Sequence, residues 1–328
     1  MSTREKATMN QIRTLYTVLF IAALIVVHGS ASALDWPKKA IQIIVPFAPG
    51  GDTDFNCRSY IEHLSKNLGT DVVIISTTGN AGAIGARKAK DSPNDGYTIF
   101  FFSSAFLANQ LTEAIDFGLE AFEFACIAGQ NPGNLICVSS ELGVSNMKEL
   151  VEYTKAHPGQ LRIAADTGGN THVIALMLQS AGVDADIVDV GASGDRIAAL
   201  LGGHVNIIIN SYGAVKDYLA SGDFVALGVA SDVEPEYIPD IPTCISQGYD
   251  VSLPLYYSFA FPKGTNPEIV AAFANAVEDV ARNNARYADT IKTAFSQSVT
   301  YYGGDEGRAK FAELKKTFDK YQKFFATK

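Results

Sequence analysis

The sequence predicts an α/β protein with two domains built on mainly parallel sheets. Short runs of β-branched residues alternate with helix-like segments along most of the chain, which is typical of that class. The 328 residues exceed the ~100–200 that one domain usually holds. With 47% hydrophobic and 19% charged residues, the composition excludes a disordered, collagen-like or coiled-coil chain.

The expected elements follow one another in strand–helix order. Polar, glycine-containing turns separate most strands from the next helix, and prolines close several elements. No flexible linker interrupts this order, so two short crossing strands are expected to join the domains. The expected strands are 41–45, 72–75, 97–102, 161–165, 187–190, 205–209 and 225–229. The expected helices are 53–67, a segment after 82 that ends before Pro93, 147–156, 173–181, 197–201, 268–282 and 305–325.

The first 33 residues have the pattern of a cleaved export signal. Arg4, Lys6 and Arg13 precede an apolar stretch over 15–27, and residues 31–33 form an A-x-A cleavage motif. The stretch is shorter than the ~20 residues that a membrane-spanning helix needs, which disfavours the alternative of an uncleaved anchor. The mature chain is expected to begin near Leu34.

Charge and missing motifs exclude several classes of function. The formal net charge is −9, and it becomes −11 without residues 1–33, because that segment carries three basic side chains and one acidic one. Nucleic acid and anionic membrane surfaces are therefore poor partners. The chain has no G-x-S-x-G, H-E-x-x-H, Walker or C-x-x-C motif, and its histidines do not occur at metal-ligand spacing. We therefore expect no catalytic residue and no metal site. We also expect no cofactor, because the glycines over 79–85 match a dinucleotide-binding loop only weakly.

The mature region contains four cysteines. An exported protein can pair four cysteines in three ways, and their spacing fits no zinc site. Because each lies in an apolar run, four small buried hydrophobic side chains are the favoured interpretation. They are Cys57, Cys126, Cys137 and Cys244.

Three polar, glycine-rich turns are the strongest functional feature. They lie at 48–54, 79–85 and 167–172, each between the carboxyl end of an expected strand and a helix. Glycine lets a ligand approach the backbone closely, and the first N–H groups of the helix carry partial positive charge. Ligands of open α/β sheets bind at this edge, so the turns are expected to bind one small anion without lysine or arginine. The alternative is that each turn is a tight connection, in which Asp52 or Thr53 simply caps a helix.

Polar residues at other strand ends are further candidates, each with a structural alternative. Ser103 and Ser104 end the third expected strand, and Asn210 ends a later one. Their hydroxyl and amide groups either bind a ligand or cap a helix. Thr171 and His172 are in the same way either hydrogen-bond donors to a ligand or structural groups.

With these turns in view, the chain resembles the extracytoplasmic solute receptors of tripartite tricarboxylate transporters, the TctC/Bug-like family. The matching motifs occur in the family's order and cover essentially the whole mature region. They lie at 36–37, 41–54, 68–69, 79–86, 93–98, 167–172, 200–206, 241–243, 247–249 and 261–265.

The resemblance implies a type II periplasmic-binding-protein-like fold, in which two α/β domains close on a ligand in the cleft between them. The first domain would comprise 34–135 and 231–328, and the second 136–230. The resemblance also implies a monomeric periplasmic receptor without catalysis, whose partners are the membrane permease subunits of a tripartite tricarboxylate transporter. One ligand carboxylate would be held by backbone groups of the first two turns, and the distal group by the second domain.

The expected ligand-binding residues combine the turns with the positions that match the family. They are Phe47, Ala48, Gly50, Gly51, Thr53, Asp54, Asn80, Ala81, Gly82, Ser103, Ser104, Thr167, Gly168, Gly169, Asn170, Thr171, His172, Gly191 and Asn210.

The sequence also departs from the family. Residues 190–192 read Val-Gly-Ala where the family commonly has Tyr-Lys-Gly, so a polar contact is missing or replaced. Arg196 either supplies a charge there or lies on the helix surface, which is the favoured alternative. Tyr256 stands where the family often has tryptophan, and it is expected to pack rather than bind.

The sequence therefore predicts a receptor that captures a small carboxylate and delivers it to a permease. The carboxylate could be a di- or tricarboxylate, an aromatic carboxylate or an acidic amino acid. Two alternatives stay open. An α/β enzyme acting on an acidic metabolite would need a paired nucleophile and base, which the sequence does not show, and a sensor receptor of the same fold would dock to a signalling partner.

Overall fold

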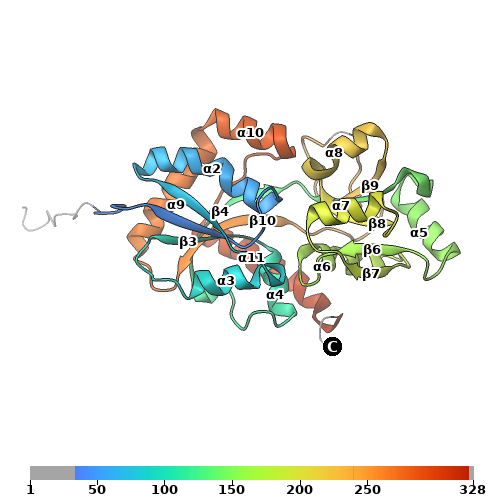
Figure 1. Cartoon of the computed structure of the whole chain (residues 1–328), viewed down its shortest axis with the longest axis horizontal. Helices are drawn as coiled ribbons and strands as arrows, with labels where there is room; N and C mark the ends of the chain where they lie inside the picture. Colours follow the sequence, from blue (N-terminus) through green and yellow to red (C-terminus); the bar gives the residue numbers. More distant parts are fainter. Residues whose placement is uncertain (1–33, 239, 325–328) are drawn as a thin grey trace, which may run out of the picture. The chain divides into compact units, whose positions relative to one another are not determined.

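Two β-sheets organise the chain in the computed structural model, which describes residues 34–238 and 240–324 (Figure 1). Contacts divide the chain into a unit over 1–36 and a unit over 37–328, and every helix and strand given below lies in the second. The predicted export signal lies outside the described residues. Within the described ranges, none of the helices combines the length and the apolar character that crossing a membrane requires.

The first sheet has six strands and is mixed. They are β1 (Ile41–Val45), β2 (Val72–Ser76), β3 (Thr98–Ser103), β4 (Phe122–Asn131), β10 (Leu255–Pro262) and β11 (Tyr302–Gly303). Their order across the sheet is β11-β4-β10-β3-β1-β2. β1 pairs in parallel with β2 and β3, whereas β10 is antiparallel to both β3 and β4, and β11 is antiparallel to β4.

The second sheet has five strands and is also mixed. They are β5 (Asn134–Ser139), β6 (Arg162–Ala165), β7 (Asp186–Asp189), β8 (Ile207–Ser211) and β9 (Phe224–Ala230), in the order β7-β6-β8-β5-β9. β6 is parallel to β7 and β8, but β5 is antiparallel to β8 and β9. The prediction of mainly parallel sheets is therefore wrong. The strands that begin or end at the crossings between the sheets, such as β5 and β10, pair antiparallel with their neighbours without a crossover helix.

Helices cover both sheets, as Figure 1 shows, with α5, α6, α7 and α8 around the second. The α-helices are α2 (Asp52–Leu68), α3 (Ala83–Lys90), α4 (Ala105–Leu111), α5 (Met147–Ala156), α6 (Asn170–Ser180), α7 (Ser193–Leu201), α8 (Tyr212–Ser221), α9 (Pro267–Asn283), α10 (Ala285–Phe295) and α11 (Gly304–Tyr321). The short 3-10 helices are η1 (Asn80–Gly82), η2 (Leu119–Ala121), η3 (Ser140–Leu142) and η4 (Gln322–Phe324).

The predicted elements agree with the structure best where local caps are strong. α5 has the predicted bounds, and its N-cap Asn146 accepts a hydrogen bond from the Glu149 N–H at 2.9 Å. The pattern did not predict α10, which begins after Asn284, a cap that accepts from the Tyr287 N–H at 3.0 Å. It also missed β4, β5 and β10. These strands are buried on both faces, so they lack the alternation that marks a half-exposed strand.

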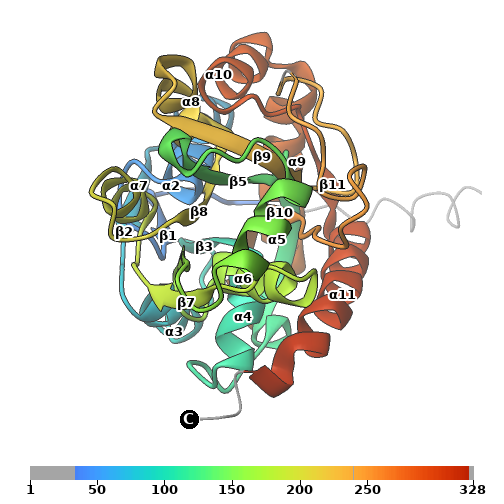
Figure 2. The ribbon, with the colours of Figure 1, turned by 90° about the vertical axis from the view of Figure 1, so that its right-hand side faces the viewer.

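One buried hydrophobic cluster extends across both sheets. It includes Phe100 and Phe102 from the first sheet and Ile136 and Ile163 from the second. α11 lies alongside α4 and α6 and so contacts a helix of each sheet (Figure 2). The sheets are therefore joined by core packing as well as by the chain crossings.

The chain crosses between the sheets close to the predicted domain boundaries. β4 ends at Asn131 and β5 begins at Asn134, and the return crossing begins where β9 ends, at Ala230. At the first crossing, Gly133 has a φ of +130° and its N–H donates to Asn131 Oδ1 at 2.8 Å. The assignment of two closing domains to these segments stays a prediction.

All four cysteines are buried and free, in agreement with the interpretation of small hydrophobic side chains. Burial raises the pKa of the Cys137 and Cys244 thiols to about 12. Both thiols therefore stay protonated and unreactive at neutral pH.

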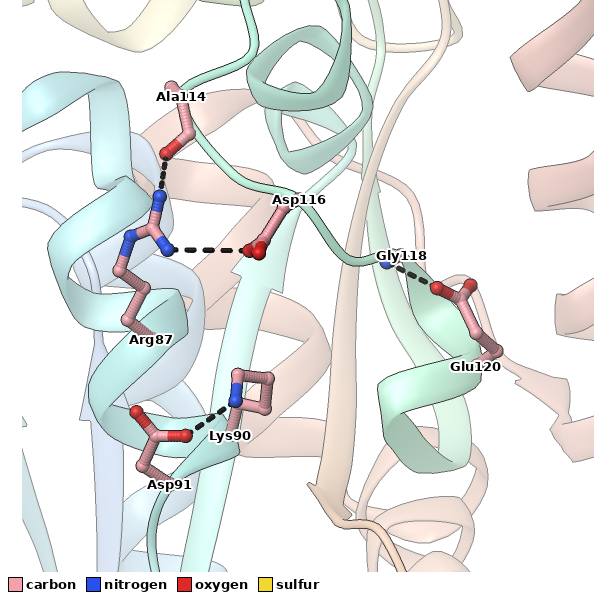
Figure 3. A network of polar contacts seen from close by, with 7 residues as sticks. All are labelled: Arg87, Lys90, Asp91, Ala114, Asp116, Gly118 and Glu120. Carbon is pink, nitrogen blue, oxygen red and sulfur yellow. Dashed lines mark hydrogen bonds and ion pairs between the residues drawn. The ribbon is translucent and has the colours of Figure 1, made fainter.

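A polar network ties the segment after α4 to α3 (Figure 3). Arg87 of α3 donates to the Ala114 carbonyl and forms an ion pair with Asp116 at 3.4 Å. Further along the segment, the Gly118 N–H donates to Glu120 Oε1 at 2.6 Å. The network fixes the carboxyl end of α4, a helix that contributes polar groups to the site described next.

Candidate ligand-binding site

The first predicted turn connects β1 to α2 and is braced from within the helix. Gly50 has a φ of +88°, and its N–H donates to Asp54 Oδ2 at 2.9 Å. Arg58 Nε donates to the same oxygen at 2.7 Å. Gly51 is the N-cap of α2, with extended backbone and no side chain capping the helix. The amino end of α2 is thus free of side-chain caps.

The second predicted turn has an unusual backbone. Gly79, Asn80, Ala81 and Gly82 all have positive φ, at +123°, +47°, +48° and +96°. Left-handed conformations cost energy for residues with a side chain, and such strain is commonly found at binding sites. The side chain of Asn109 in α4 donates from Nδ2 to the Ala81 carbonyl at 3.2 Å and so supports the turn.

A small pocket of about 10 Å³ lies beside this turn, which is room for about one water molecule. The turns and β3 line it with backbone and polar groups, and aromatic rings close it. The lining residues are Pro46, Phe47, Ala81, Gly82, Phe100, Phe102, Ser103, Phe106 and Asn109.

The third predicted turn connects β6 to α6 and is held by its own hydrogen bonds. The Asp166 N–H donates to Thr171 Oγ1 at 2.9 Å, and the Gly168 N–H donates to His172 Nδ1 at 3.4 Å. Gly168 has a φ of +81°, and a β-carbon there would lie 3.2 Å from the side chain of Thr112 at the end of α4. A glycine is needed because the turn approaches the helix from the other sheet closely. Thr171, predicted as a ligand donor or structural group, has its hydroxyl in a structural hydrogen bond.

Two hydrogen bonds, from Ser211 to Asp52 and from Asn170 to Ser104, join the sheets at these turns, and we call the region around them the junction. Ser211, at the end of β8, donates from Oγ to Asp52 Oδ1 at 2.8 Å, and Asn131 donates from Nδ2 to Asp52 Oδ2 at 3.1 Å. Asn170, at the start of α6, donates from Nδ2 to Ser104 Oγ at 3.4 Å. Asp52 and Ser104 therefore link the first sheet to the second.

Burial perturbs two carboxyl groups at the junction. It raises the pKa of Asp52, and the hydrogen bond from Ser211 and the charge of Arg196 offset part of the effect. Burial also raises the pKa of Asp166, to about 6, with Arg196 opposing the shift and Asp189 adding to it. The junction thus concentrates negative charge whose cost the protein only partly compensates.

Arg196 is buried at the junction, so the favoured prediction that it lies on the helix surface is wrong. Arg196 is only 7% exposed, and its Nε donates to Asn210 Oδ1 at 3.0 Å. Its Nη1 donates to the Gly191 carbonyl. Asn210 in turn donates to Ser193 Oγ at 2.7 Å. Two predicted site residues, Gly191 and Asn210, therefore position an arginine.

The structure brings the predicted residues together on both sides of the junction. Phe47, Ser103 and the second turn line the pocket, while Ser104 and Asn170 bridge the sheets. Asp54 is committed to bracing the first turn. Tyr256 is buried and packs against the Phe311 ring, with centroids 6.1 Å apart, as expected. That these residues contact a ligand stays a prediction.

Five residues of the junction were missed or left undecided by the sequence. Asp52 lies in the first turn, but the other four belong to no motif described above, and all five meet at the junction through long-range packing. Asp52 follows two glycines and Ser211 follows Asn210, and both are common helix-capping residues. Nothing in the sequence indicates that they pair with each other. The five residues are Asp52, Asn109, Asp166, Arg196 and Ser211.

The chain thus has the fold of periplasmic binding proteins: two mixed sheets covered by helices, with strand-end turns of both meeting at the junction. The part of the chain that the structure describes holds no group of three His, Cys, Asp or Glu side chains that could bind a metal ion. A solved structure described as a periplasmic transporter has 25% sequence identity and a TM-score of 0.78, covering 89% of this chain and 98% of that one. The Rhodopseudomonas palustris protein Rpa4515, solved with adipate, has 22% identity and a TM-score of 0.78, covering 88% of this chain and 97% of that one.

The family model of the tripartite tricarboxylate transporter family receptor (TctC) matches residues 57–316. Protein BugT of Bordetella pertussis is 29% identical over 285 residues, which cover 84% of this chain and 87% of that protein. The chain belongs to the TctC/Bug family of solute receptors, as its motifs predicted. These receptors are periplasmic and bind solutes rather than transform them.

Proposed function

We propose that the protein captures a small carboxylate at the junction and presents it to the membrane subunits of a tripartite tricarboxylate-type permease. The observation that carries the proposal is the uncapped amino end of α2 beside the left-handed turn over 79–82. Both expose backbone at the carboxyl ends of neighbouring parallel strands, β1 and β2. An anion there meets N–H groups and the positive end of a helix dipole.

The backbone geometry explains how an acidic protein can bind an acidic ligand. Neither turn contains a lysine or arginine, and the Arg58 side chain beside the first turn is bonded to Asp54. Backbone donors carry no net charge, so they bind a carboxylate without adding a strong positive field outside the site. The adipate in the related R. palustris structure is a dicarboxylate, which supports the same ligand class here.

The second sheet supplies the contacts to the distal part of the ligand. Residues 166–172 and Gly191 lie at the carboxyl ends of β6 and β7, opposite the first two turns. We propose that the segments 34–135 with 231–328 and 136–230 act as two domains that close on the ligand. The hydrogen bonds of Asp52 and Ser104 across the junction are then contacts of the closed form.

The remaining assignments follow from the family and the sequence. We propose that residues 1–33 are cleaved during export, that the mature protein starts near Leu34 as a periplasmic monomer, and that it has no catalytic activity. The family consists of solute receptors, which supports a binding role.

A thermal-shift panel tests the proposal. Dicarboxylates, tricarboxylates, aromatic carboxylates and acidic amino acids are added to the mature protein, with neutral sugars as controls. At least one carboxylate should raise the melting temperature in proportion to ln(1 + [L]/Kd), because a ligand that binds the folded state stabilises it by mass action. A shift with a neutral sugar and with no carboxylate would overturn the proposal, and so would turnover of a bound carboxylate.

A further inference from the structure

Arg196 is a buried cation without a carboxylate in contact. Its guanidinium donates to two neutral acceptors, Asn210 Oδ1 and the Gly191 carbonyl. Among the described residues, no carboxylate oxygen lies within 4 Å of a guanidinium nitrogen of Arg196, the limit for an ion pair. Asp166 and Asp52 are nevertheless near enough to affect the pKa of Arg196. Removing a guanidinium from water is costly, and neutral acceptors repay only part of that cost.

The place of Arg196 in its helix adds to this cost. It lies in the first turn of α7, where the helix dipole favours negative charge and disfavours a cation. Burial lowers its pKa against the opposing effects of Asp166, Asp52 and Asp195. These three acids offset only part of the cost of burying the guanidinium, and an anionic ligand group would complete its set of partners.

Asp166 is the complementary group. No donor within the described residues contacts its carboxylate oxygens, and its hydrogen bonds are made by its backbone. It is half-buried at the carboxyl end of β6, where the charges of Arg196 and Asp189 affect its pKa, and His172 of α6 lies on the same turn. Besides the Asp166 carboxylate, a second acceptor without a partner lies nearby in the sequence. It is Oδ1 of Asn170, a residue that is 6% exposed at the start of α6.

The distal part of the site thus has one unpaired cation and two unpaired acceptors. A simple carboxylate satisfies Arg196 but adds negative charge beside Asp166. A carboxylate that carries a neighbouring ammonium group satisfies both, because the ammonium has three donors for Asp166 and for Asn170 Oδ1. This arrangement is the α-carbon end of an amino acid.

We propose that Arg196 and Asp166 determine specificity by binding the α-carboxylate and α-ammonium of a dicarboxylic amino acid. The side-chain carboxylate of that ligand lies on the backbone turns of the first sheet, so the inference rests on the proposed function. It narrows the ligand class from small carboxylates to acidic amino acids.

Calorimetric titration of three matched ligand pairs tests the inference on the mature protein. The pairs are aspartate with succinate, glutamate with glutarate, and 2-aminoadipate with adipate, which differ only in the ammonium group. At about pH 8, the best amino member should bind at least about tenfold more tightly than its partner, as expected for one charged hydrogen bond. If a diacid binds as tightly as its amino partner, the inference is wrong and the proposed function stands; if no carboxylate binds, both are wrong.

Two variants with matched controls assign the effect to residues. Asp166→Asn should remove the preference for the amino member, and Arg196→Gln should weaken both members by about tenfold or more. The controls Asp319→Asn and Arg286→Gln change exposed residues and should leave every affinity unchanged. Equal affinities for Arg196→Gln and Arg286→Gln would overturn the role of Arg196.

The pH profile of the unmodified protein gives a readout that needs no variant. As the pH falls through about 6, Asp166 gains a proton, with Arg196, Asp189, Asp52 and His172 as the charged or titratable groups around it. Affinity for the amino member should fall while affinity for the diacid rises. Parallel profiles for the two members would contradict the assignment of the ammonium to Asp166.

Discussion

The side of the junction that belongs to the first sheet is made of backbone, and the side that belongs to the second is made of charged side chains. On the first side, Gly50 and the four residues 79–82 have left-handed backbone, and the amino end of α2 has no side-chain cap. On the second side, Arg196 is buried and Asp166 is half-buried, and neither contacts a group of opposite charge among the described residues. The two sides therefore store different kinds of unfavourable energy, conformational strain and incomplete solvation.

This difference separates two tasks. Neutral backbone donors recognise any carboxylate that reaches them, because they offer direction and partial charge but no preference for what the carboxylate is attached to. Buried charges discriminate strongly between ligands, because a ligand group that does not pair with them leaves their desolvation penalty uncompensated. The comparison predicts general anion binding by the first sheet and selection by the second.

Changing the backbone side should give the largest effect. Gly51→Val should lower ligand affinity by about hundredfold, since a side chain over the end of α2 blocks about two charged hydrogen bonds. The fold should tolerate it, because Gly51 has extended backbone and a β-carbon there meets only the Ala48 carbonyl at 3.7 Å. Calorimetry measures the affinity, with Gly303→Val as control: Gly303 is also an extended N-cap glycine with open space around it. Normal binding by Gly51→Val would exclude the helix terminus as the anion site.

On the charged side, Asp166→Asn should stabilise the ligand-free protein. The pKa of Asp166 is raised to about 6 in the folded state, so its ionised form destabilises the fold above that pH. The variant should gain roughly 1–3 kcal/mol in free energy of unfolding at about pH 8. The gain should shrink as the pH falls through 6 and vanish below about 4, where both states are protonated. Urea unfolding at several pH values measures this, and a variant no more stable than the parent at high pH would contradict it.

Removing the hydrogen bond between Ser211 and Asp52, which joins the two sides, should have a smaller effect on stability. Ser211→Ala removes the hydroxyl donor at 2.8 Å from the half-buried Asp52 carboxylate and should cost about 1–2 kcal/mol of stability. The bond lowers the pKa of Asp52, so its contribution is present at high pH and is lost as the pH falls and Asp52 is protonated. Ser298→Ala removes the same kind of bond, Oγ to Glu236 Oε2 at 2.8 Å, at an exposed site and should cost less than about 0.5 kcal/mol. Equal losses in chemical unfolding would show that burial of Asp52 does not matter.

The smallest effect on affinity is expected at Arg58. Arg58→Ala should change the ligand affinity by less than about twofold, because the arginine contacts Asp54 and leaves the α2 amino end to the backbone. Its side chain is 54% exposed, but Asp54 is buried, so a stability loss of about 1 kcal/mol is expected. Arg282→Ala breaks a similar i,i+4 pair at 2.7 Å whose acid is exposed, and it should cost less. A large affinity loss for Arg58→Ala alone would replace the backbone mechanism with a salt bridge.

Local chemistry was enough to predict the three turns, but not the groups that complete the site between them. Gly50, Gly82 and Gly168 all have positive φ, which is why glycine marks these turns in the sequence. Arg196, in contrast, follows Asp195 near the start of an amphipathic helix, where an exposed arginine is the ordinary reading. Its burial depends on Asn210 and Gly191, which lie on other elements.

The sequence by itself determined the α/β class, most element positions, the family and the edge of the sheets at which the turns gather. These properties depend on periodicity, glycine and capping residues, which act over a few neighbouring positions. The tertiary structure alone decided the antiparallel crossing strands, the Asp52–Ser211 bond and the burial of Arg196. Each of these joins residues that are distant in the chain or depends on solvent exclusion by both sheets, and local pattern carries no information on either.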